Sequence, residues 1–347
     1  MIDKKKQMQF NINNFLLAVT DILDAKDCEN NGVTKKHSLR VAFVSLKIAN
    51  KMNFEPKELF DLCAYALFHN YIDEDKLKIL NIKNDANKLS TLIDFVHLID
   101  QNFNFAYEHI SNRESIKKFL KLNKQTQYSD VLLEDCSCLE FWLDCQSPNV
   151  MLQYIYGTLH DFTSVYDFEK VLEITTMFGE LYEDLTQLLK LSNLICDYYK
   201  FEHKDKQTFL IACSLMNFGK LAIPSFIIEK KGGLSEEEYE LLKSNVYYLK
   251  NGLINVYGFN DICSWASRHH ESLNGKGYPS CLSAKDLSLK DRLISIINIV
   301  NASLSHRSYR DKLDMAQTIK IIHKKANNGE IDKALVEDLE HLILNFI

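Results

Sequence analysis

Glycine and proline are scarce in this sequence, which has 11 Gly and 4 Pro among 347 residues. Because these residues form tight turns and interrupt helices, their scarcity favours long uninterrupted helices over a strand-and-turn architecture. All the glycines except Gly32 lie beyond position 150. Shaped loops are therefore expected mainly in the second half of the chain.

An excess of positive charge and a metal-binding cysteine pattern are also missing. The formal net charge is −6, which argues against a partner that is a nucleic acid polymer or an anionic membrane. Nine cysteines are present, but Cys136 and Cys138 form only a CxC, and Cys145 follows without a second pair. Scattered thiols of this kind are typical of reduced core residues, which predicts a cytoplasmic protein.

Long apolar runs are absent as well. The basic start of the chain, Met1 to Lys6, is not followed by the apolar segment of a signal peptide. No apolar run reaches the length that spans a bilayer, so no membrane insertion is expected.

The chain does have the composition and length of a two-domain globular protein, with 46% hydrophobic and 25% charged residues. Ser147-Pro148-Asn149 is the best short boundary signal, and it predicts domains at 1–150 and 151–347. Helical spacing of apolar residues predicts an all-α fold. The expected helices cover about 12–26, 36–52, 57–68, 88–102, 114–122, 151–159, 168–178, 181–199, a segment beginning after 235, 289–303, and 314–345.

The two halves share a helix–loop–helix spacing that indicates an internal duplication. A shift of 147 residues (192 − 45) brings Ser45 onto Ser192 and Asn70 onto Asn217. Beyond Asn217 the second half continues with a GKLAIP run at 219–224, which the first half does not have.

One stretch concentrates the residues most suited to chemistry, Arg268-His269-His270-Glu271-Ser272-Leu273-Asn274-Gly275-Lys276-Gly277-Tyr278-Pro279. Adjacent imidazoles can bind a metal, and two glycines with a proline define a tight backbone path. With the upstream GKxxIP run and a later RxYR, this HHExxxGxGYP motif resembles the HD-GYP division of the HD phosphohydrolases. Residues 184–335 match nearly the whole module, and residues 15–70 resemble the start of a second copy.

The resemblance implies two HD-type helical bundles, the second with the HD-GYP extension. It also implies hydrolysis of cyclic di-GMP or a related cyclic dinucleotide at a cluster of two or three metals, for which iron or manganese would suit the mixed ligands. Most ligand positions are changed in this chain. The first ligand histidine falls on Asp184, and the others fall on Met216-Asn217, Asn245 and Asn298. Only His269 and His270 match in type, so a residual metal set would be His269, His270 and Asp184.

The first copy is degenerate in another way. His37 and His69 match two ligand histidines, Asn70 replaces the HD aspartate, and the late aspartate falls near His97. His37 and His69 could hold one ion, although ordinary packing between helices is favoured. For His269 and His270, metal or phosphate contact competes with a relic pair satisfied by helix carbonyls, and the missing partners favour the relic.

Several features other than metal ligands survive in the second copy. They define the predicted ligand-binding set: Lys220, Arg292, Gly277, Tyr278, Arg307 and Arg310. The basic members could form an anion pocket or ordinary surface ion pairs, and the glycine loop could be kept for the fold alone.

Three functions are compatible with these residues. The favoured one is a catalytically inactive HD-GYP-like signalling protein that binds other signalling proteins and could also sense a cyclic dinucleotide, with no cofactor expected. The second is a cyclic dinucleotide receptor that binds without hydrolysis. The third is an active cyclic di-GMP phosphodiesterase with a rearranged metal site, which would use iron or manganese.

Overall fold

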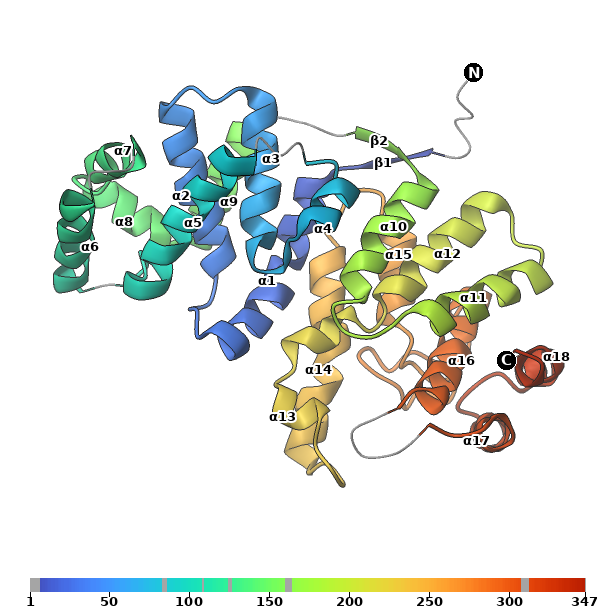
Figure 1. The fold of residues 1–347 in the computed structure, drawn as a ribbon. Coiled ribbons are helices and arrows are strands. Elements are labelled where there is room, and N and C mark those ends of the chain that lie inside the picture. The colour runs from blue at the N-terminus through green and yellow to red at the C-terminus, as the bar shows by residue number, and fades with distance from the viewer. Residues whose placement is uncertain are drawn as a thin grey trace, which may run out of the picture. The chain divides into compact units, whose positions relative to one another are not determined.

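The computed structural model describes residues 7–82, 86–107, 109–123, 127–159, 164–306 and 312–346. Within these ranges the only strands are β1 (Gln7–Phe10) and β2 (Ser164–Asp167), which pair with each other (Figure 1). The predicted all-α class is confirmed, although the short strand pair was not predicted. The α-helices are α1 (Ile12–Asn31), α2 (His37–Lys51), α3 (Pro56–Phe68), α4 (Glu74–Ile79), α5 (Ala86–Phe103), α6 (Ile110–Leu122), α7 (Gln127–Asp135), α8 (Leu139–Gln146), α9 (Pro148–Leu159), α10 (Phe168–Gly179), α11 (Thr186–Tyr198), α12 (His203–Leu215), α13 (Ser225–Ile228), α14 (Glu236–Leu253), α15 (Asn260–Ser267), α16 (Leu289–Leu304), α17 (Met315–Asn327) and α18 (Lys333–Leu344).

The chain folds as two compact units. Residues 11–164 form one, here called the N-terminal unit, and 165–347 with 1–10 form the other, the C-terminal unit. Pro148, part of the predicted boundary signal, is the first residue of α9, which packs on α2 and α3 inside the N-terminal unit. The division into 1–150 and 151–347 stays a prediction.

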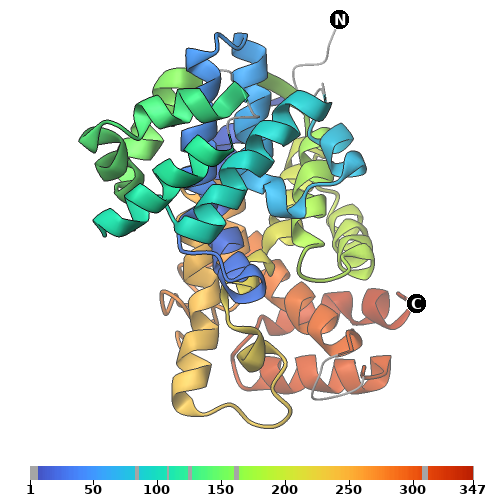
Figure 2. The ribbon, with the colours of Figure 1, turned by 60° about the vertical axis from the view of Figure 1, so that its left-hand side comes forward.

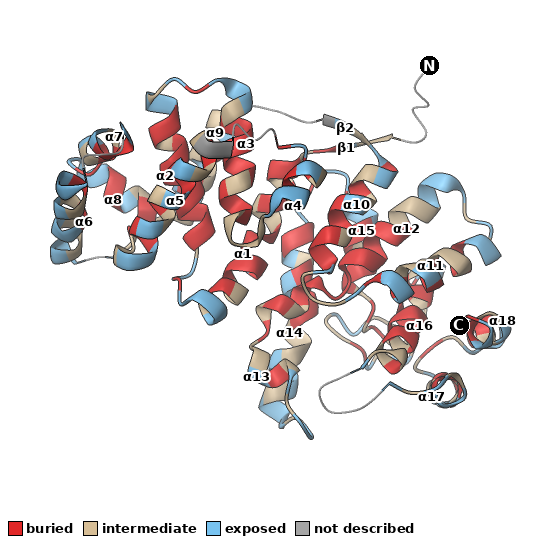
Figure 3. Ribbon diagram, in the orientation of Figure 1, coloured by how far each residue is buried: buried red, intermediate tan, exposed pale blue. Residues whose placement is uncertain are grey.

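Helix α2 lies at the centre of the N-terminal unit. It packs against α1, α3, α5 and α9, and most of its residues are buried, as the red colour of the α2 ribbon in Figure 3 shows. Helix α3 begins at Pro56, where the ring fixes a helical φ and the missing N–H is not needed. Glu55 and Glu58 form a capping box at the same end, so the start of α3 is specified by the local sequence.

The C-terminal unit is built around α12 and α15, with α10, α11, α14 and α16 packed about them. Helix α14 begins at the capping box of Ser235 and Glu238, and the short helix α13 packs beside it (Figure 2). The predicted helical region 314–345 is two helices, α17 and α18, which pack on each other. Gly329, with φ of 70°, lies in the turn between them.

None of the helices in the described part of the chain combines the length and apolar character needed to cross a membrane. All nine cysteines are free.

Candidate functional site

The HHE stretch, His269-His270-Glu271, follows α15 and is continuous with the glycine loop that it stabilises. His269 is buried, and its Nδ1 donates to the carbonyl of Ala266 at 2.6 Å. Because a carbonyl can only accept, Nδ1 carries the proton and Nε2 is a bare acceptor. That Nε2 is buried and has no hydrogen-bond partner. The neighbouring His270 stacks on Tyr278, with 4.7 Å between the ring centroids.

Glu271 supports the loop through both of its carboxylate oxygens. Its two carboxylate oxygens accept from the backbone N–H groups of Ser280 at 2.7 Å and Leu282 at 2.9 Å. Gly277 packs against the same segment, since a Cβ at this position would lie 2.3 Å from the backbone nitrogen of Ser272. The glycine is therefore required by close backbone approach, which explains the glycine loop without any appeal to catalysis.

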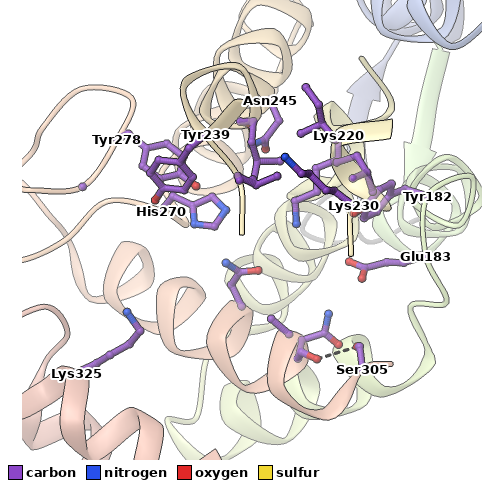
Figure 4. Close-up of a pocket in the computed structure, with 18 of the residues that line it drawn as sticks. Tyr182, Glu183, Lys220, Lys230, Tyr239, Asn245, His270, Tyr278, Ser305 and Lys325 are labelled. Atoms are coloured by element: carbon purple, nitrogen blue, oxygen red, sulfur yellow. Dashed lines mark hydrogen bonds between the residues drawn. The ribbon is translucent and has the colours of Figure 1, made fainter. Parts of the chain in front are cut away.

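A cavity of about 1420 Å³ opens beside this loop within the C-terminal unit. Figure 4 shows Tyr278, Tyr239 and His270 along one part of its wall and Lys220, Lys230 and Tyr182 along another. The lining includes four lysines and three tyrosines, namely Lys220, Lys230, Lys276, Lys325, Tyr182, Tyr239 and Tyr278. Cations and aromatic faces in one hollow suit a ligand that carries both phosphates and planar rings.

The metal-ligand positions of the family do not fit a metal cluster here. Met216 is a buried thioether, and Asn217 donates its amide to Glu183. Asn245 donates to the carbonyl of Leu242 at 2.6 Å. The carbonyl oxygens of both asparagine side chains are buried without partners, so these two positions offer neutral acceptors where bridging carboxylates would be needed. Asn298 lines the cavity and is equally neutral.

The predicted metal set does not come together as a group of close donors. Asp184 lines the cavity but is exposed, and its Oδ1 accepts from the backbone N–H of Thr186 at 2.8 Å, just before α11. Among the described residues, the only group of three or more histidine, cysteine or acidic side chains with mutually close ligand atoms lies elsewhere.

Arg292 does not belong to the cavity, although the sequence analysis placed it in the ligand-binding set. Its guanidinium donates to Asp332 at 2.8 Å and to the carbonyls of Leu287 and Ala284 at 3.1 and 2.6 Å. It therefore connects the start of α16 to the start of α18. Of the other predicted residues, Lys220, Gly277 and Tyr278 line the cavity, whereas Arg307 and Arg310 lie outside the described residues.

The electrostatic environment keeps both histidines of the motif neutral. Burial, together with the nearby charge of Lys220, lowers the pKa of His269 to about 3. Burial also holds the pKa of His270 well below its usual range, with His269 and Lys220 acting in the same direction. The cationic groups of this cavity are therefore its lysines, and four carboxylates, those of Glu183, Asp184, Glu229 and Glu330, line it as well.

The group of close donors lies in the N-terminal unit and consists of His37, His69 and His97. His97 Nδ1 lies 2.9 Å from His37 Nε2 and 2.8 Å from His69 Nε2. The sequence analysis named His37 and His69 but did not join His97 to them. The available signal was that His97 falls at the position of the family's late aspartate, on α5, which packs on both α2 and α3.

Comparison with known proteins agrees with this architecture. A family model described as HD domain matches residues 171–335. The 3'3'-cGAMP-specific phosphodiesterase 1 of Vibrio cholerae is 31% identical over 121 residues, which cover 35% of this chain and 28% of that protein. The cyclic di-GMP phosphodiesterase response regulator RpfG of Xanthomonas campestris is 28% identical over 134 residues, covering 38% of this chain and 35% of RpfG.

The solved structure of a V. cholerae cyclic GMP-AMP specific phosphodiesterase, V-cGAP3, superimposes with a TM-score of 0.63. The alignment covers 98% of this chain and 99% of that one at 15% identity, so it establishes a common fold. Residues 171–335 match the HD domain model, and the predicted resemblance to the HD-GYP division is confirmed. The matched segments span about a third of the length of the curated relatives.

Proposed function

We propose that this chain is a signalling protein whose C-terminal unit binds a cyclic dinucleotide without metal-dependent hydrolysis. The observation that carries the proposal is the large cavity combined with neutral residues at the ligand positions. Its volume of about 1420 Å³ exceeds the usual range of small-molecule pockets, roughly 300–1,000 Å³, and leaves room for a dinucleotide. The named relatives act on cyclic di-GMP or 3'3'-cGAMP, which identifies the ligand class to test.

The cavity residues supply the contacts that such a ligand needs. Lysine ammonium groups bind phosphate as point charges, and purine bases stack on tyrosine faces. Lys220 lies over the ring of Tyr182, with 5.4 Å from its nitrogen to the ring centroid, so a cation and an aromatic face are offered together. Cleavage of the phosphodiester would require ions held close together, and Met216, Asn217 and Asn298 do not supply the charged ligands for that purpose.

Transmission of the signal by protein contact is the second part of the proposal. Helix α14 and the turn after it expose Tyr247, Ile254 and Tyr257 by 55%, 55% and 64%. Exposed aromatic and aliphatic side chains gathered on one element are typical of protein interaction sites. Chemical cross-linking in the source cell tests this interaction. The wild-type protein should form a covalent adduct with a partner, and the double variant Tyr247→Ser/Ile254→Ser should not. An adduct of equal yield in the double variant would refute the proposed protein contact.

An active phosphodiesterase with a rearranged metal site is the alternative, and the three-histidine group of the N-terminal unit is the observation that favours it. Assays of cyclic di-GMP and 3'3'-cGAMP hydrolysis with Mn²⁺ and with Fe²⁺ distinguish the receptor from the active phosphodiesterase. The receptor proposal predicts no linear dinucleotide product. Turnover that disappears in His97→Gln would establish the alternative.

Calorimetric titration with cyclic di-GMP and with 3'3'-cGAMP tests binding directly. Lys220→Ala should weaken binding by about 10-fold or more, because a lost hydrogen bond to a charged group costs about 1.5–3 kcal/mol. Lys333→Ala is the matched control, since Lys333 is an exposed lysine on α18 that pairs with Glu337 and does not line the cavity. If neither nucleotide binds the wild type, or if both lysine variants lose affinity equally, the receptor proposal fails.

A further inference from the structure

We propose that α14 pairs with α14 of a second copy of this chain in an antiparallel, two-fold symmetric contact. The pairing surface, here called the contact stripe, consists of Leu241, Ser244, Tyr247, Tyr248, Asn251 and Ile254. The pairing rests on the protein contact of the proposed function and identifies the partner as the same chain.

The two sides of α14 have different surroundings. One side packs on α13, α15 and the 3₁₀ helix η3 (Phe218–Ala222) within the C-terminal unit. Its buried residues are Asn245, Val246, Leu249, Gly252 and Leu253. Tyr239 and Leu242 line the cavity beside them. Because successive residues turn by about 100°, the contact stripe lies on the opposite side of the helix. One helix therefore carries both a wall of the cavity and the contact stripe.

The contact stripe has the composition of an interface core. Its large side chains are 38–55% exposed, namely Leu241, Tyr247, Tyr248 and Ile254. The charged residues of α14 between Leu241 and Ile254 are Lys243 and Lys250, and both are only partly exposed. Enrichment in tyrosine and depletion of exposed charge distinguish interface cores from the rest of a protein surface.

The spacing of the contact stripe is the same in both directions along the helix. Its midpoint falls between the two tyrosines. Ser244 and Asn251 lie equally far from this midpoint, and so do Leu241 and Ile254. A two-fold axis at the midpoint brings each residue level with its counterpart in the other copy. Aliphatic side chains are then level with aliphatic ones, and short polar side chains with short polar ones.

The short polar residues allow the two helices to approach closely. Ser244 and Asn251 are about two turns apart, so both lie on the line that faces the other copy. The tyrosines lie about 50° to either side of this line, since they are adjacent in sequence. Helix axes about 8–10 Å apart then place each tyrosine beside the same tyrosine of the other copy.

The charges at the ends of α14 favour the antiparallel direction. The first turn contains Glu236, Glu237 and Glu238, and the last turn contains Lys250. Antiparallel pairing brings the acidic end of each helix towards the basic end of the other, whereas parallel pairing would bring the two acidic ends together. The opposed helix macrodipoles act in the same direction.

The size of the contact stripe predicts a weak and reversible dimer. Its four large side chains expose roughly 400 Å² per copy, taking about 200 Å² for one such side chain in full exposure. A standard interface buries about 800 Å² per partner. The dimer is therefore expected to form and dissociate with protein concentration.

Disulfide formation between engineered cysteines tests the register. Ser244 lies beside Asn251 of the other copy, but the two copies of Ser244 are offset by about 10 Å along the helix, the rise of seven residues (251 − 244). A disulfide needs Cα atoms within about 7 Å of each other. Mild oxidation of a mixture of Ser244→Cys and Asn251→Cys proteins should therefore give covalent dimers, and either protein alone should not.

The oxidation uses full-length protein with Cys28→Ser, Cys138→Ser and Cys281→Ser, because these three thiols are not buried. Leu241→Cys alone is the control for direction. Two copies of this residue lie about 20 Å apart in the antiparallel pair and side by side in a parallel one.

Sedimentation equilibrium measures the strength of the pairing. The wild type should show a monomer–dimer equilibrium, and Tyr247→Ser should raise its dissociation constant by about 10-fold or more, because both copies lose a central aromatic side chain. Tyr198→Ser is the matched control, since Tyr198 is 48% exposed on α11, outside the contact stripe, and should leave the constant unchanged.

A wild type that stays monomeric at about 0.5 mM, well above the micromolar range, would overturn the proposal. So would disulfide dimers of Leu241→Cys alone, or equal yields from the mixture and from the separate cysteine proteins. If the monomeric wild type still forms its adduct in the source cell, a different protein occupies the contact stripe and the proposed protein contact stands. Calorimetric titration of the same samples with nucleotide tests the receptor separately.

Discussion

The buried ion pair of Asp100 and Arg40 provides a sharp test of how the N-terminal unit is stabilised. Both side chains are almost fully buried, with exposures of 0% and 3%. Asp100 also accepts from His37 and from a backbone N–H, so it satisfies four donor groups at once. Its pKa is lowered to about 2: although burial alone would raise it, the hydrogen bonds and charges of His37 and Arg40 outweigh that effect. The carboxylate is therefore ionised under ordinary conditions.

Asp100→Asn keeps the shape of the side chain but removes its charge. The Arg40 guanidinium is then left buried without a counter-ion, a change that typically costs about 3–5 kcal/mol. That loss is a large part of the total stability of a domain, about 5–15 kcal/mol. With a urea slope of about 2 kcal/mol per molar, the midpoint of unfolding should fall by about 1.5–2.5 M.

The two tryptophans allow the units to be followed separately. Trp142 lies in the N-terminal unit and Trp265 in the C-terminal unit, and both are buried. Urea titrations with chelator present, in Trp265→Phe and Trp142→Phe backgrounds, should show the loss only with the Trp142 signal. Glu134→Gln is the control, because Glu134 and its partner Lys51 are 74% and 39% exposed, and such a pair contributes at most about 1 kcal/mol. A fall of less than about 0.5 M in Asp100→Asn, near 1 kcal/mol, would refute the reasoning.

Two further predictions concern pH and the loop. Burial lowers the pKa of His69 and of His269 to about 3, below the unfolded value near 6.5, so the metal-free protein should lose stability as pH falls from 6.5 towards 3. Each histidine contributes up to about 1.4 kcal/mol per pH unit, and Asp24, whose pKa burial raises to about 6, opposes them below that pH. Urea midpoints should therefore rise between pH 5 and 7, and a flat or falling profile would contradict these burial effects. Gly277→Ala should cost about 1–3 kcal/mol and weaken nucleotide binding, because its Cβ would meet loop backbone at 2.3 Å. Gly157→Ala is the control, because a Cβ at this position on α9 meets no atom, so the change should be neutral or stabilising. If calorimetry shows equal losses in Gly157→Ala and Gly277→Ala, close backbone approach does not explain the glycine at 277.

Local sequence signals predicted the helices well where they were strong. Pro56 and the Ser235 capping box mark helix starts that the structure reproduces. Helical periodicity alone could not separate α17 from α18, since Gly329 between them resembles an isolated glycine within a helix. The β1–β2 pair joins segments of four residues each from opposite ends of the first 167 residues. So short a pairing leaves no periodic pattern to detect.

The candidate cavity was partly predictable because one contiguous loop supplies many of its residues. Gly277 and Tyr278 belong to the recognised motif, and both line the cavity. Arg292 was assigned to the ligand because it matches a basic position of the family. Its ion pair could not be predicted, because Asp332 lies far along the chain and becomes adjacent only when α16 and α18 are folded. The three-histidine group has the same cause: His37, His69 and His97 come from three helices, and only tertiary packing joins them.

The central proposal is that the C-terminal unit binds a cyclic dinucleotide and does not hydrolyse it. The most direct test incubates metal-reconstituted full-length protein with cyclic di-GMP or 3'3'-cGAMP and measures bound nucleotide and linear product in the same sample. The account predicts nucleotide bound to the protein with no linear product above the protein-free control, in Mn²⁺ and in Fe²⁺ alike. Repeated turnover that is lost in His270→Ala would contradict it.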